Sequence, residues 1–232
     1  MSTAAPASAD AVNADLVELA RSCYHDPFKF VRVAYPWGEP GTMLEHHAGP
    51  DVWQEKFLRD LGKEIHANGF DGHTPVMPVT RAVSKGHGVG GSVMIAWLVD
   101  WIASTRPHSQ GVVTANTQTQ LDTKTWAAIR RWSRLMLWSH WFEINTQKLY
   151  HKAYPESWFC TAQTCREENS EAFAGQHAAD STSYYLMDED SAIPSIIHEV
   201  AEGGMTDGEP MMFRFGNPTR NSGDFFACCF GT

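Results

Sequence analysis

The sequence lacks any apolar run close to the roughly 20 residues that a membrane-spanning helix requires. Its five cysteines show neither the spacing of a zinc site nor that of a disulfide framework, although Cys228 and Cys229 are adjacent. The first dozen residues contain no lysine or arginine, so they do not resemble a secretory signal. These absences lead us to expect a reduced, intracellular protein.

Basic residues are also scarce, with 18 Lys and Arg against 27 Asp and Glu and a net charge of -9. This balance argues against a chain that coats nucleic acid through its overall charge, while it leaves room for a local basic surface. The histidine pair at 46–47, His87 and His177 do not supply the three or four convergent ligands of a zinc site. A 43% apolar content with nine tryptophans is enough for the core of one large α/β domain or two small ones.

Short apolar segments alternate with segments of helical periodicity along the chain. We expect strands over 76–83, 111–115, 158–162, 184–187 and 211–215, and helices over 10–24, 50–65, 93–104 and 118–138. The aromatic and proline-rich segment 26–40 and the polar segment 166–180 are expected to be loops. This alternation predicts an α/β fold with a mainly parallel central sheet and helices on both faces.

The most informative segment is Ser-Lys-Gly-His-Gly-Val-Gly-Gly-Ser at 84–92, between a β-prone segment and an apolar helical one. Its glycines allow several backbone N–H groups to point at an anion, and the N-terminus of the following helix adds partial positive charge. The pattern is typical of a loop that binds the phosphates of ATP, with the hydroxyl of Ser92 on Mg²⁺. The residues expected to contact the nucleotide here are Lys85, Gly86, His87, Gly88, Val89, Gly90, Gly91 and Ser92.

The loop departs from the usual pattern Gly-x-x-x-x-Gly-Lys-Ser/Thr at one position, because Gly91 stands where the lysine is expected. Lys85 lies at the opposite end of the loop, and its flexible stem is able to reach across toward the phosphates. Two alternatives follow: Lys85 supplies the missing charge to a working ATPase, or Lys85 is solvated and the nucleotide site is degenerate.

Two acids follow the apolar strand at 184–187. In a nucleotide hydrolase the first acid, here Asp188, holds Mg²⁺, and the second, Glu189, accepts a proton from the attacking water. In isolation such a pair is commonly just a turn or a helix cap. The next acid, Asp190, is expected to be only a helix cap.

Three further polar residues are candidates for nucleotide contacts. Asn217 and Thr219 lie in an Asn-Pro-Thr turn directly after the strand at 211–215, where they would contact the γ-phosphate or its attacking water. Gln54, beside Trp53, is placed to read the edge of the adenine. Alone, Asn-Pro-Thr is only a turn signal, and Gln54 is equally a solvated helix residue.

Several arginines are candidates for a different role. Arg130, Arg131 and Arg134 share a predicted helix with three tryptophans, and Arg81 lies just ahead of the loop. The helix is either an ordinary amphipathic surface helix or the carrier of a subunit contact, a DNA contact or an arginine finger. Arg81 is a second candidate for a finger or a phosphate contact.

Taken in order, the motifs resemble those of the large terminase subunit of tailed bacteriophages and prophages. The segments that carry the resemblance are Asp-Pro-Phe-Lys-Phe-Val at 26–31, Trp-Gln at 53–54, the glycine loop at 86–90, Thr-Ala-Asn-Thr at 114–117, Glu-Ala-Phe-Ala-Gly at 171–175, Met-Asp-Glu at 187–189, Ala-Ile-Pro at 192–194 and Gly-Asn-Pro-Thr-Arg at 216–220. The resemblance implies a P-loop ATPase domain of the additional-strand (ASCE) type that drives viral DNA into a preformed capsid. Some members of the family carry their lysine at the first position of the loop, which is Lys85 here.

The resemblance also implies a domain division and partners. We expect a disordered lead-in at 1–10, a helical region on the adenine side at 11–72 and the ATPase core at 73–232, with the family's nuclease domain absent. The implied cofactors are ATP and Mg²⁺. The implied partners are double-stranded DNA, the portal and capsid, the small terminase subunit and further copies in a ring, in the cytoplasm of an infected or lysogenic bacterium and without a membrane.

Three functions remain open at this point. The first is ATP hydrolysis coupled to DNA translocation. The second is a catalytically degenerate P-loop module in nucleotide sensing, DNA contact or capsid docking. The third is a helicase-like remodelling ATPase, which would share the same site.

Overall fold

A seven-stranded sheet forms the centre of the computed structural model, which describes residues 9–86, 88–165, 170–171, 173–174, 178, 180–217 and 224–230. The strand order is β1-β7-β6-β2-β5-β4-β3. The first five strands in this order, β1, β7, β6, β2 and β5, pair in parallel. The last two strands add an antiparallel hairpin. The strands are β1 (Val79–Ser84), β2 (Gln110–Ala115), β3 (Phe142–Ile144), β4 (Lys148–His151), β5 (Phe159–Ala162), β6 (Ser183–Asp188) and β7 (Met211–Gly216).

The strand order places one strand between the two that carry the predicted motifs. β7 pairs with β1 on one side, up to Ser84 opposite Gly216, and with β6 on the other, up to Asp188 opposite Phe215. Because these strands are parallel, the glycine loop, the two acids and Asn217 all follow strands at the same edge of the sheet. The predicted mainly parallel sheet is confirmed, and the inserted β7 is the additional strand of an ASCE fold.

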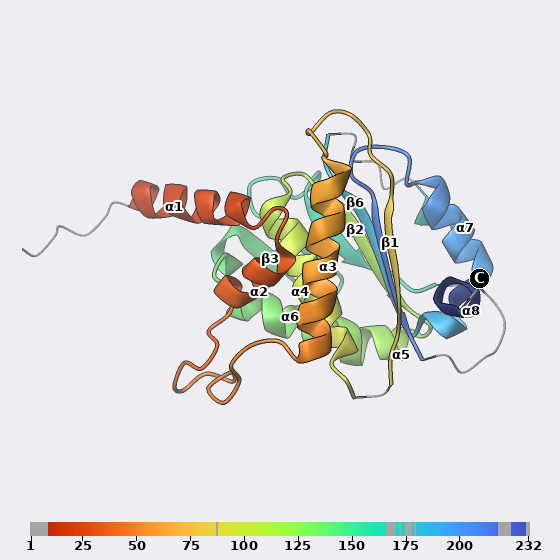
Figure 1. Cartoon of the computed structure of the whole chain (residues 1–232), viewed down its shortest axis with the longest axis horizontal. Coiled ribbons are helices and arrows are strands. Elements are labelled where there is room, and N and C mark those ends of the chain that lie inside the picture. The colour runs from red at the N-terminus through yellow and green to blue at the C-terminus, as the bar shows by residue number, and fades with distance from the viewer. Residues whose placement is uncertain are drawn as a thin grey trace, which may run out of the picture.

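Helices pack on both faces of the sheet, as predicted (Figure 1). On one face, Leu186 and Phe213 join a large core with the almost completely buried α4 (Gly91–Thr105). On the other face, Met187 and Met212 pack with α7 (Ser195–Gly203). Neighbouring strand residues point to opposite faces, so the apolar strands supply both cores at once.

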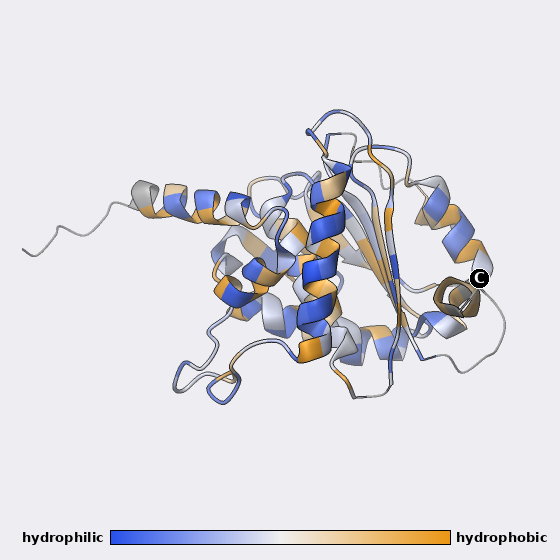
Figure 2. Cartoon of the chain, viewed as in Figure 1, coloured by the Kyte–Doolittle hydropathy of each residue, from blue (hydrophilic) through white to orange (hydrophobic). Residues whose placement is uncertain are grey.

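The remaining helices extend the first face. They are α1 (Ala9–Ser22), α2 (Pro27–Ala34), α3 (Val52–Asn68), α5 (Gln118–Gln120) and α6 (Trp126–Leu135). The exception is α8 (Asp224–Phe230), which lies next to α7 (Figure 1). Hydrophilic and hydrophobic residues lie on different sides of α3, as expected for a helix that is buried along one face (Figure 2). Among the described helices, none is long and apolar enough to cross a membrane.

The prediction of a loop over 26–40 is wrong in its first part, because α2 lies there. The backbone N–H of Lys29 donates to the side chain of Asp26 at 2.8 Å, and Pro27 begins the helix. An aspartate cap followed by proline is a recognised start signal, and it leads into a helix that buries Phe30 and Val31.

The continuous helix expected over 118–138 is also wrong. A π-helical turn over Leu121–Thr125 separates α5 from α6, and α6 ends at Leu135. The hairpin β3–β4 and helix α7 had no sequence prediction. Residues 1–8 of the expected lead-in, and 166–169, 172, 175–177 and 179 of the expected polar loop, lie outside the described residues.

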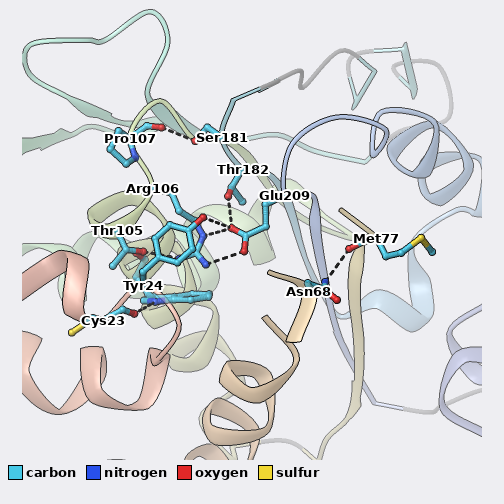
Figure 3. Close-up of polar contacts among 11 residues, drawn as sticks. Cys23, Tyr24, Asn68, Met77, Thr105, Arg106, Pro107, Ser181, Thr182 and Glu209 are labelled. Carbon is cyan, nitrogen blue, oxygen red and sulfur yellow. Dashed lines mark hydrogen bonds and ion pairs between the residues drawn. The ribbon is translucent and has the colours of Figure 1, made fainter. Parts of the chain in front are cut away.

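A buried ion pair closes the edge of the sheet opposite the glycine loop (Figure 3). Arg106 follows the end of α4, and its Nε donates to Oε2 of Glu209 at 2.6 Å, with both side chains 1% exposed. Tyr24 and Thr182 donate hydroxyl hydrogen bonds to the same carboxylate. The guanidinium also lies 4.2 Å from the ring of Trp101 and 4.0 Å from that of Tyr24. The pair therefore joins α1 and α4 to the segments that lead into β6 and β7.

A second buried carboxylate lies in the middle of α4. Asp100 accepts hydrogen bonds from the hydroxyls of Tyr35, at 2.7 Å, and Ser133, at 2.6 Å. Burial raises the pKa of Asp100 to about 7, although the two hydrogen bonds act in the opposite direction. Between about pH 4 and pH 7, the folded chain therefore holds a proton on Asp100, whereas the unfolded chain, in which the pKa of this group is 3.8, has released it.

We expect this proton to make stability depend on pH. The contribution is fully present below about pH 4 and is lost as the pH rises toward about 7, because over this window the folded state binds more protons than the unfolded state. Asp100→Asn should flatten this part of the stability curve, measured by urea unfolding between pH 4 and 8. The exposed α1 variant Asp15→Asn is the control, and parallel curves for parent and Asp100→Asn would contradict the raised pKa.

Candidate active site

The glycine loop connects β1 to α4 in the arrangement that the sequence predicts. Gly88 and Gly90 have φ angles of 75° and 83°, in the left-handed region that favours glycine, and α4 begins at Gly91. The backbone N–H of Lys85 donates to the carbonyl of Gly216 at 2.8 Å, which fastens the start of the loop to β7. The predicted loop residue His87 lies outside the described residues.

The side chain of Lys85 reaches both predicted acids. Its ammonium lies 3.1 Å from Oε1 of Glu189 and 3.5 Å from Oδ1 of Asp188. A Cβ placed on Gly91 would lie 2.5 Å from Cδ and 2.6 Å from Cε of the lysine. Lys85 therefore occupies the space next to the backbone at 91, and the absence of a side chain at Gly91 makes room for it.

Asp188 is held on both of its oxygens. Oδ2 accepts hydrogen bonds from the hydroxyls of Ser92, at 3.2 Å, and Thr125, at 2.6 Å, while Oδ1 accepts one from the backbone N–H of Glu189. The side chain of Asp188 is 1% exposed and that of Glu189 is 24% exposed. Glu189 has a φ of 54°, a conformation that non-glycine residues adopt at a cost of about 1–3 kcal/mol and that is enriched at active sites.

Gln54 and Trp53 hold the loop from the side of α3. The side-chain amide of Gln54 donates to the carbonyl of Gly90 at 3.4 Å and accepts from the backbone of Asp51 at 2.9 Å. The indole of Trp53 donates to the carbonyl of Val89 at 3.1 Å. Their observed partners are thus backbone groups, and the contact of Gln54 with adenine stays a prediction.

The residues predicted after β7 are only partly described. Asn217 directly follows Gly216, the residue bonded to the backbone of Lys85, so it lies at the same sheet edge as the loop. Thr219 lies outside the described residues.

A cavity of about 290 Å³ opens over the loop. Three of its lining residues, Val93, Gln120 and Lys124, were not predicted as site residues from the sequence. The others are Lys85, Gly86, Gly88, Val89, Gly90, Gly91, Ser92 and Glu189. Thr125, which touches Asp188, was also missed. The sequence does give one indication of Gln120, Lys124 and Thr125. They follow the carboxyl end of β2, and open α/β sheets bind ligands at the carboxyl ends of their strands.

The prediction that Asp190 only caps a helix is wrong. Asp190 is 1% exposed, and its carboxylate accepts a hydrogen bond from Arg214 of β7 at 2.9 Å. A second hydrogen bond joins the carboxylate to His198 of α7 at 2.7 Å. Residues from two other elements thus neutralise this acid, and a local sequence pattern does not show them.

The candidate arginines take no part in the described site. Arg81 forms an ion pair with Glu64 of α3. Arg130, Arg131 and Arg134 lie on α6, which buries Trp126, Ile129 and Trp132 along its other face. This burial is what the amphipathic surface-helix interpretation expects.

The side chains and backbone groups at the loop suit a nucleotide with Mg²⁺. Mg²⁺ in such sites takes one or two carboxylates, waters and phosphate oxygens, and the hydroxyl of Ser92 and carboxylate of Asp188 already lie together. The ammonium of Lys85 between the two acids shows that this position accepts a cation. Phosphates suit the glycine-rich start of α4.

A double-mutant cycle tests whether Lys85 occupies the space at position 91. Gly91→Ala should destabilise the parent relative to the same change made in a Lys85→Ala chain, because the new Cβ displaces the lysine stem only when the stem is present. We expect a coupling of about 1 kcal/mol in urea unfolding. Additive effects would show that the two side chains do not compete for this space.

Comparison with known proteins returns terminases, although no family model matches the chain. The "Probable terminase, large subunit" of Enterobacteria phage P7 is 26% identical over 216 residues, which cover 90% of this chain and 40% of that protein. The crystal structure of the HK97 bacteriophage large terminase has a TM-score of 0.50 at 14% identity, covering 82% of this chain and 37% of that one. The Thermus phage P74-26 large terminase ATPase domain has a TM-score of 0.42 at 17% identity, covering 64% and 61%.

The sequence relative and the fold comparison agree with the motif order. This chain spans about 40% of the length of the phage P7 relative, and the likeness to the HK97 protein concerns the fold. The resemblance drawn from the motifs is confirmed: the chain is similar in sequence to a probable large terminase subunit of a bacteriophage and shares its fold with part of the HK97 large terminase.

Proposed function

We propose that this chain binds ATP with Mg²⁺ and hydrolyses it, as the ATPase part of a phage terminase large subunit. The observation that carries the proposal is the convergence of Lys85, Ser92, Asp188 and Glu189 at one glycine loop, from β1, α4 and the end of β6. Terminase relatives support the same assignment.

In this proposal the loop and the acids have separate tasks. Backbone N–H groups of the loop and the N-terminus of α4 bind the phosphates. Ser92 and Asp188 hold Mg²⁺, which would neutralise charge on the phosphate oxygens. Glu189 lines the cavity and is the general base that accepts a proton from the attacking water. Asn217 and Thr219, after β7, are proposed to contact the γ-phosphate or that water.

Lys85 is proposed to supply the cation that the loop lacks at Gly91. Its stem lies against Gly91 and its ammonium reaches the acids, so the charge is already within the site although it comes from the opposite end of the loop. With Mg²⁺ held by Ser92 and Asp188, the ammonium of Lys85 would be free to contact phosphate.

The wider role follows from the relatives. We propose that hydrolysis drives double-stranded DNA into a capsid, with the portal and capsid, the small terminase subunit and a nuclease domain as partners. The motor would act as a ring of copies in the cytoplasm of the infected or lysogenic bacterial host. DNA-stimulated ATP turnover on this chain tests the link to DNA, and a degenerate binding module would show no turnover with or without DNA.

Glu189→Gln tests the proposed base. The amide keeps the size of the side chain but cannot accept the proton, so ATP binding should persist while turnover falls by about two orders of magnitude or more. Turnover is measured as phosphate release and binding with a fluorescent ATP analogue. Glu199→Gln, an exposed acid on α7, is the matched control. A Glu189→Gln chain that hydrolyses ATP like the parent would place the base elsewhere.

Lys85→Ala tests the source of the missing charge. A charge-assisted contact to phosphate contributes about 1.5–3 kcal/mol, so the affinity for ATP should fall by about ten- to a hundredfold. Titration calorimetry of both chains measures the change, with the exposed Lys152→Ala as the control. Unchanged affinity in Lys85→Ala, together with a parent that does not turn over ATP, would favour the degenerate module.

A further inference from the structure

The π-helical turn between α5 and α6 lies against the proposed site. Turns of this kind are rare and are often found where a helix serves a function. This one contacts both α4 and β2. Its third residue from the start, Thr123, is exposed and bonds back to the carbonyl of Thr119 at 2.6 Å, as helical threonines commonly do. Its last residue, Thr125, does not.

Thr125 is completely buried and directs its hydroxyl at Asp188. The oxygen-to-oxygen distance to Oδ2 is 2.6 Å, shorter than the 3.2 Å from Ser92 to the same oxygen. Short hydrogen bonds to a carboxylate are the strong, orienting ones. The partner lies 63 residues away in the sequence, at the end of β6.

The two hydroxyls on Asp188 differ in what they do once a metal is bound. In the proposed site the hydroxyl of Ser92 would be a ligand of Mg²⁺ and would share its oxygen between the metal and the carboxylate. Thr125 does not line the cavity over the loop, and among the described residues its hydroxyl bonds to Asp188 alone. It is therefore the side chain that can keep the carboxylate in one orientation both before and after the metal binds.

We propose that Thr125 is a positioning residue for the metal-side carboxylate of Asp188, delivered to the site by the π-helical turn. This inference rests on the proposed function, because it assigns Asp188 to Mg²⁺. Groups that orient a metal ligand from behind typically change metal affinity or activity by about 10–100-fold when they are removed.

The test is a Mg²⁺ titration of nucleotide binding by the 232-residue chain, followed with a fluorescent ADP analogue. Thr125→Val removes the hydroxyl at nearly constant volume and should raise the Mg²⁺ concentration at half-maximal binding by about tenfold or more. Binding of the analogue without Mg²⁺ should be unchanged, which also shows that the variant is folded. Thr125→Ser restores a hydroxyl and should titrate close to the parent, and Thr123→Val is the control from the same turn.

The outcomes separate this inference from the proposed function. A parent that shows Mg²⁺-dependent binding, beside a Thr125→Val chain with the same titration, overturns the role of Thr125 alone. A parent that binds no nucleotide with Mg²⁺ overturns the proposed function and this inference with it. If Thr125→Val does not fold, Thr125→Ala is titrated in its place, and a parent-like curve for that variant again overturns the inference.

Discussion

The contact of one ammonium with two carboxylates depends on almost every feature of this fold. Lys85 follows β1 and the acids end β6, yet these strands are not neighbours, because β7 lies between them. The contact therefore requires parallel strands that end in register, a loop that curls through left-handed glycines and a residue without a side chain at Gly91. A change in any of these would separate the charges.

Helix α4 is buried because it is largely apolar, and polar groups fix it at both ends. At its N-terminus the glycine loop and Ser92 connect it to the acids. Beyond its C-terminus, Arg106 forms the buried pair with Glu209 (Figure 3). Removing one partner from such a pair leaves an uncompensated buried charge, so the pair restricts where the helix can sit even if it adds little net stability.

The sequence was sufficient to predict the parts of the fold that follow from local patterns. The apolar runs that became β2, β6 and β7, the glycine loop and its helix were all predictable, and the parallel arrangement then brought Asp188 and Glu189 to the loop. Helix α2 carries two opposing local signals: Asp26 and Pro27 indicate a helix start, whereas the aromatic and proline-rich composition of 26–40 favours a loop.

The rest depends on contacts between distant residues. Nothing near Thr125 in the sequence indicates that its hydroxyl meets Asp188, and the π-helical turn that carries it interrupts what reads as one amphipathic helix. In the same way, Asp190 looks like a cap until Arg214 and His198 are placed beside it. Partners of this kind are set by tertiary packing, which a single sequence does not reveal.

The position of the lysine has a mechanical consequence. In the usual loop the cation is carried by the first turn of the helix, so it travels with that helix. Here the backbone of Lys85 is hydrogen-bonded to Gly216 and continues the pairing of β1 with β7. The cation thus belongs to the sheet, together with the segment that begins at Asn217. A displacement of α4 against the sheet would move the N-terminus of α4 relative to the ammonium of Lys85. Such a movement would therefore change the distance between the two groups proposed to bind the phosphates.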